Sequence, residues 1–117
     1  MRTPILATLA FSLGAGAALA MSPGERDAAY RALADEYAAR ATYTATLEKF
    51  GDVAPFVSIR EAETSHISAL SRALEAAGEP VPADPYLNGE MQIPTLPDTL
   101  AEICAIGVKA EIANAAL

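Results

Sequence analysis

Glu63 and His66 are the residues of this 117-residue chain whose types and spacing could do chemistry. They form a Glu-x-x-His pair on a stripe in which apolar residues recur every three or four positions, as on one face of a helix. A carboxylate and an imidazole on such a face are costly to bury unless they are paired or bind a metal. The same spacing lets one helix supply two metal ligands in some four-helix bundles. The stripe comprises Phe56, Ile59, Glu63, His66, Leu70, Ala73 and Ala77.

The pair by itself also has a simpler interpretation. His66 is the only histidine, and a lone histidine on an apolar face is more often a core residue that bonds a backbone carbonyl. A four-residue pattern with two free positions also arises readily by chance. The metal hypothesis therefore depends on whether other helices bring acidic side chains to the same depth.

The first helix of the mature chain is expected to run from about Ser22 to Phe50. Ser22 is a good N-cap, Glu25 completes the spacing of a capping box, and Gly51 is a stop signal. Its apolar stripe carries one acid. The stripe comprises Ala29, Leu33, Glu36, Tyr37, Arg40, Tyr43 and Leu47.

A second helix is expected after a tight turn at Gly51 and Asp52. Asp52 is the predicted cap, Pro55 lies in the first turn, and the helix continues to about Ala77 before the stop signal of Gly78. A turn this short between two long helices predicts antiparallel neighbours.

Residues 79–97 are too rich in proline to be helical, since five of the eight prolines lie there. An extended connection of this length fits a crossover from one end of a helix bundle to the other. A third helix is expected to begin between residues 95 and 98. Its stripe comprises Leu100, Cys104, Val108, Glu111 and Ala115.

The third helix carries an open apolar face and no stop signal before Leu117. We therefore expect the chain to be cut short before a fourth helix. The alternative is a three-helix protein whose last helix pairs with another subunit, so a homo-oligomer formed through this helix is one partner that the sequence allows.

Each predicted helix thus places an acid on its apolar stripe: Glu36, Glu63 beside His66, and Glu111. Each acid has a structural alternative when taken singly. Glu36 could form a surface pair with Arg40 four residues later, and Glu111 could be solvated at a helix end. Together with His66, the acids match the order of ligands in a helix-bundle metal site.

With these residues in this order, the chain resembles the bacterial ferritin-like domain family of unknown function. The resemblance implies an all-α, ferritin-like antiparallel bundle with three of four helices present, able to carry a di-iron or di-manganese centre. It extends over nearly the whole mature chain, and the family's own biochemical function is poorly defined. It rests on Asp35-Glu36-Tyr37, on residues 55–59 (PFVSI), 61–70 (EAETSHISAL) and 84–87 (DPYL), and on residues 107–112 (GVKAEI).

The candidate metal ligands are Glu36, Glu63, His66 and Glu111. Three carboxylates and one imidazole can hold one ion, with Glu63 and Glu111 as candidates for bridging, whereas a second ion would lack ligands. Carboxylate oxygen with one imidazole suits Fe(II), Mn(II) or Zn(II) better than Cu(I). If iron is bound, open positions would permit reaction with oxygen or peroxide.

Residues 1–20 have the pattern of a secretory signal peptide, which leaves residues 21–117 as one helical domain. Arg2 supplies the positive start, residues 5–20 are apolar, and Ala18-Leu19-Ala20 is a cleavage site. An uncleaved membrane anchor is the alternative, although the apolar run is short for a bilayer. We therefore expect a periplasmic or secreted protein.

Composition excludes several other classes of function. A net charge of −7 without a basic cluster argues against nucleic acid as a partner. Cys104 is the only cysteine, so no internal disulfide is possible, and we expect it to be a small buried hydrophobe. No Gly-x-Ser-x-Gly elbow or Gly-rich phosphate loop is present, and the sequence assigns no enzymatic activity.

Two functions remain open. The first is an exported ferritin-like protein that binds a metal through carboxylates and one histidine in the bundle core. The alternative is a non-catalytic helical interaction module without a working metal site, which would bind a partner through the proline-rich connection or the third helix.

Overall fold

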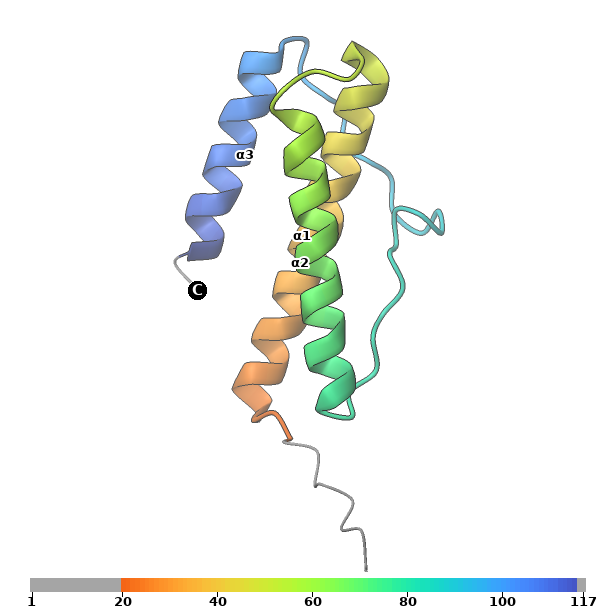
Figure 1. The fold of residues 1–117 in the computed structure, drawn as a ribbon, viewed down its shortest axis with the longest axis vertical. Helices are drawn as coiled ribbons and strands as arrows, with labels where there is room; N and C mark the ends of the chain where they lie inside the picture. Colours follow the sequence, from red (N-terminus) through yellow and green to blue (C-terminus); the bar gives the residue numbers. More distant parts are fainter. Residues whose placement is uncertain (1–19, 116–117) are drawn as a thin grey trace, which may run out of the picture.

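The computed structural model describes residues 20–115 and contains three α-helices in that range (Figure 1). These are α1 (Pro23–Phe50), α2 (Phe56–Ala76) and α3 (Leu100–Ala115). Helices α1 and α2 form an antiparallel hairpin, and α3 packs against α1 near the turn of that hairpin. The all-α prediction is therefore confirmed, while the predicted signal peptide lies outside the described residues. None of the helices in residues 20–115 is long and apolar enough to cross a membrane.

Helix α1 begins and ends where its sequence signals predict. The Ser22 hydroxyl oxygen accepts a hydrogen bond from the Glu25 amide, and the Glu25 carboxylate accepts one from the Ser22 amide. This capping box satisfies backbone donors that an uncapped first turn would leave free. At the other end, Gly51 adopts a φ of 82°, a conformation that favours glycine, and its amide donates to the Leu47 carbonyl.

The expected cap of α2 is wrong, because Asp52 does not cap this helix. Pro55 occupies the N-cap position and makes no side-chain capping bond. The amide of Phe56 instead donates to the carbonyl of Val53, at 3.0 Å, so a backbone turn satisfies the first free donor. The predicted stop at Gly78 is confirmed, since Gly78 has a φ of 75° just after the helix ends.

Two clusters of apolar side chains hold the helices together. One joins the part of α1 nearer its N-terminus to the part of α2 nearer its C-terminus, and the other joins the region of the hairpin turn to α3. Glu63 is the one buried residue of α2 between Phe56 and Ile67, so a carboxylate interrupts the apolar core between the two clusters. The first cluster contains Leu33, Tyr37, Ile67 and Leu74, and the second contains Tyr43, Leu47, Phe56 and Ile103.

The connection between α2 and α3 is extended, as predicted, and runs back along the hairpin (Figure 1). Side chains of α1 fix it in place. The Tyr37 hydroxyl donates to the Pro82 carbonyl at 2.8 Å, and the Arg40 guanidinium bonds the Asp84 carboxylate at 2.6 Å. Arg40 therefore does not form the surface pair with Glu36 that its spacing allows.

The expected apolar stripe of α2 is wrong at His66 and Ala73, whereas its Leu70 packs against the core as expected. The His66 side chain is 57% exposed, and Ala73 is also exposed, whereas Ile67 and Leu74 are buried against α1. Both sets of positions follow helical spacing. The observed face is the more stabilising one because it removes two large aliphatic side chains from water.

The expected face of α3 is wrong as well. Ile103 is buried against α1, while Cys104 and Val108 are exposed. Gly107 lies against the hydroxyl end of Tyr43, where an added Cβ would overlap the phenol oxygen. A glycine at this place lets α3 approach α1 closely, and this contact selects the face that the alanine-rich pattern does not define.

Candidate metal centre

Helices α1 and α2 bring Glu36, Glu63 and His66 together. Nδ1 of His66 lies 3.3 Å from Oε2 of Glu36 and 3.7 Å from Oε2 of Glu63. One donor atom from each residue lies within 4.8 Å of the other two. Zinc bonds to nitrogen and oxygen of about 2.1 Å separate two tetrahedral ligands by about 3.4 Å. The two distances from Nδ1 of His66 are close to this separation, and the three residues form a group that could hold one ion.

The cluster extends from the core to the surface. Glu63 is 3% exposed, the Glu36 side chain 17% and the His66 side chain 57%. The structure thus corrects the expectation of a histidine in the bundle core. Because the imidazole lies at the outer rim, an ion from solvent can meet it before it reaches the buried carboxylate.

Glu63 carries the one buried side-chain oxygen that lacks a hydrogen-bond partner within the described part of the chain, its Oε2 atom. A buried polar group without a partner costs about 1–3 kcal/mol, and more if it is charged. Burial is the main reason why the pKa of Glu63 rises to about 7; the nearby Glu36 raises it further, and His66 opposes the rise. A bound cation would supply the missing partner.

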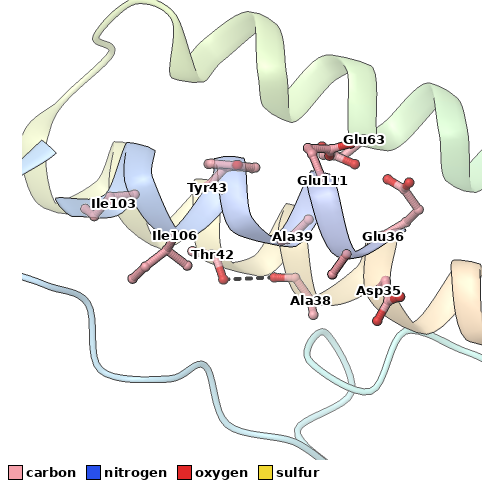
Figure 2. Close-up of a pocket in the computed structure, with 13 residues that line it drawn as sticks. Asp35, Glu36, Ala38, Ala39, Thr42, Tyr43, Glu63, Ile103, Ile106 and Glu111 are labelled. Carbon is pink, nitrogen blue, oxygen red and sulfur yellow. Dashed lines mark hydrogen bonds between the residues drawn. The ribbon is translucent and has the colours of Figure 1, made fainter. Parts of the chain in front are cut away.

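Glu111 reaches the same region from α3 but lies outside the group of three. It lines a cavity of about 470 Å³ between α1 and α3, whose wall also includes Glu36 and Glu63 (Figure 2). Burial raises the pKa of the Tyr43 hydroxyl, and the charges of Glu63 and then Glu111 raise it further. Tyr43, Glu63 and Glu111 all line this cavity.

Tyr43 and Gly107 are the two residues of this region whose roles the sequence pattern does not reveal. The pattern places Tyr43 on an apolar stripe, whereas in the structure it lines the cavity together with the acids. Gly107 offers one signal, since an isolated glycine inside a helical pattern usually has a packing or functional reason.

Comparisons with family models, with curated proteins and with solved structures find no match for this chain. The structure itself shows three helices in residues 20–115, an antiparallel α1–α2 hairpin, and a Glu/Glu/His cluster that could hold a metal ion.

Proposed function

We propose that this chain is an exported metal-binding protein of the ferritin-like type, which holds one divalent ion through Glu36, Glu63 and His66. The observation that carries the proposal is the buried, unpartnered oxygen of Glu63 within reach of two further donor atoms. An acid-rich surface would not by itself suggest a site, because exposed carboxylates are solvated. A carboxylate at this depth needs a partner.

Glu111 is the fourth ligand in this proposal. Its support is its position on the same cavity wall as Glu36 and Glu63. Because it comes from α3, an ion that recruited it would link the third helix to the hairpin. One ion is proposed rather than two, since four side chains leave a second ion short of ligands.

Fe(II), Mn(II) and Zn(II) are the ions that match two or three carboxylates and one imidazole. Such an ion has coordination positions that the protein does not fill, and iron or manganese would add one-electron chemistry. The three side chains have distinct roles in this proposal. Glu63 neutralises the charge of the ion in the core, His66 supplies a nitrogen ligand at the surface, and Glu36 lies between them.

Export is proposed from the leader pattern of residues 1–20 alone. The ferritin-like type is proposed from the sequence resemblance, and the long connection between α2 and α3 supports it, since that type of bundle has a crossover.

Isothermal titration of the metal-free chain with Zn²⁺, Mn²⁺ and, without oxygen, Fe²⁺ tests the proposal. We expect one ion per chain. Glu63→Gln should weaken binding at least about tenfold, since it removes a charged ligand while conserving shape. Glu61→Gln, on the same helix but exposed, is the matched control and should bind as the parent does. Equal affinities of the two variants would refute the assignment.

A second function, an interaction module, has one observation in its favour. Helix α3 exposes Ile106, Val108 and Ile112, and exposed apolar surface favours association. Light scattering after size exclusion would detect the homo-oligomer. Val108→Glu with Ile112→Lys should yield a monomer, whereas a parent chain that is monomeric at high concentration would exclude self-association through α3.

A further inference from the structure

The cavity between α1 and α3 has two chemically different ends (Figure 2). The carboxylates of Glu36, Glu63 and Glu111 lie at one end, and Ile103 and Ile106 lie at the other. Its volume of about 470 Å³ is within the ~300–1,000 Å³ of small-molecule sites, which combine apolar walls with a few polar groups.

The polar end of the cavity is negative. Four acids line the cavity, and the lining residues, all within the described part of the chain, include no lysine or arginine. Glu63 is 3% exposed, and its Oε2 lacks a hydrogen-bond partner. A ligand that fits this cavity would therefore carry a positively charged hydrogen-bond donor at one end and an apolar group at the other.

We propose that this cavity binds a small organic cation, a primary ammonium group on a short apolar body. The ammonium would donate to Glu63 and Glu111, because charge-assisted hydrogen bonds are the strongest that this end can form. The apolar body would lie against Ile103 and Ile106, where it replaces water. Three N–H donors suit an end lined by several carboxylates.

This inference goes beyond metal binding and does not require it. His66 does not line the cavity, so the two ligands share Glu36, Glu63 and Glu111 but not the imidazole. A metal ion and an ammonium would therefore compete, and each proposal can fail without the other.

Titration calorimetry of the full chain in a metal chelator tests the inference with three probes of equal chain length: n-hexylamine, hexan-1-ol and hexanoate. We expect hexylamine to bind at least about tenfold more tightly than hexanol, a ratio typical of one charged hydrogen bond, and hexanoate not to bind. Similar affinities for the amine and the alcohol, or no binding of the amine, would overturn the proposal.

Variants test the organic site, and His66→Ala is the one that separates it from the metal site. Glu111→Gln should weaken hexylamine binding about tenfold, and Glu48→Gln, exposed elsewhere on α1, should leave it unchanged. His66→Ala should retain hexylamine binding even if it loses metal. Circular dichroism shows that each variant is folded; a folded Glu111→Gln chain with parental affinity for hexylamine would overturn the proposal, and loss of metal binding alone would not.

Discussion

Nδ1 of His66 lies 3.3 Å from Oε2 of Glu36, although thirty residues separate them in the chain. The antiparallel α1–α2 hairpin creates this contact. It also brings the buried carboxylate of Glu63 within 3.7 Å of the same nitrogen. The relationship explains why an exposed histidine can still belong to a site that begins in the core.

The raised pKa of Glu63 predicts a specific pH dependence of stability without metal. The pKa is about 7 in the folded chain, against an ordinary 4.5, so the folded state holds a proton that the unfolded state has lost between these values. The free energy of unfolding should therefore fall as pH rises from about 4.5 through 7, by up to roughly 3 kcal/mol. Urea titrations across this range measure it, and Glu63→Gln should flatten the curve. A parent and variant with parallel curves would contradict the assignment.

Metal affinity should depend on pH in the opposite sense. Binding needs the ionised Glu63 carboxylate, so the ion must displace a proton when the pH lies below a pKa of about 7. We expect the affinity for Zn²⁺ to rise between pH 5.5 and 7.5, with proton release visible in buffers of different ionisation heat. Binding without proton release at pH 6 would argue for ligands other than Glu63.

Gly107→Ala should detach α3 from α1, because the new Cβ would overlap the Tyr43 hydroxyl. Overpacking of this kind costs about 1–3 kcal/mol. Gly24→Ala is the matched control, since nothing lies within 4 Å of its Cβ position in α1, and alanine there should stabilise by up to about 1 kcal/mol. Thermal melts measure the stability of each variant, and hydrogen exchange of the α3 amides reports whether α3 stays packed on α1. Equal behaviour of the two variants would contradict the close approach.

The ion pair of Arg40 and Asp84 should hold the α2–α3 connection onto α1. Asp84→Asn leaves the largely buried guanidinium without its charged partner, at a cost of about 1–3 kcal/mol. Asp98→Asn is the control, because its carboxylate is fully exposed beside Lys49, and surface pairs contribute little. If both variants lost the same stability, the buried pair would have no special role.

The helix ends could be predicted from sequence where the signal is local. The Ser22–Glu25 capping box and the glycines at positions 51 and 78 act through neighbouring backbone groups, so spacing alone identifies them. The cap at Asp52 failed because a backbone turn satisfies the Phe56 amide instead. That choice depends on the geometry of the hairpin, which no short pattern contains.

The buried faces were harder to predict than the helices. Alanine-rich helices have no sharp polar boundary, and on α2 two neighbouring stripes share Glu63, so the pattern alone could not choose Ile67 over His66. The same holds for α3, where a tertiary contact at Gly107 decides the face. The convergence of Glu36, Glu63 and His66 was predictable because a short turn fixes the register of the hairpin, whereas the place of Glu111 depends on a long connection.

The most direct test of the proposed metal site is a comparison of thermal melts for the parent chain and His66→Ala, each with a divalent metal and with a chelator. We predict that metal raises the melting temperature of the parent by mass action on the folded state, and that His66→Ala loses most of this rise. With chelator the two should melt at nearly the same temperature, since the imidazole is largely exposed. Ser65→Ala, exposed on the same helix, should behave as the parent. Equal destabilisation of His66→Ala with and without metal would leave His66 as a structural residue and contradict the metal site.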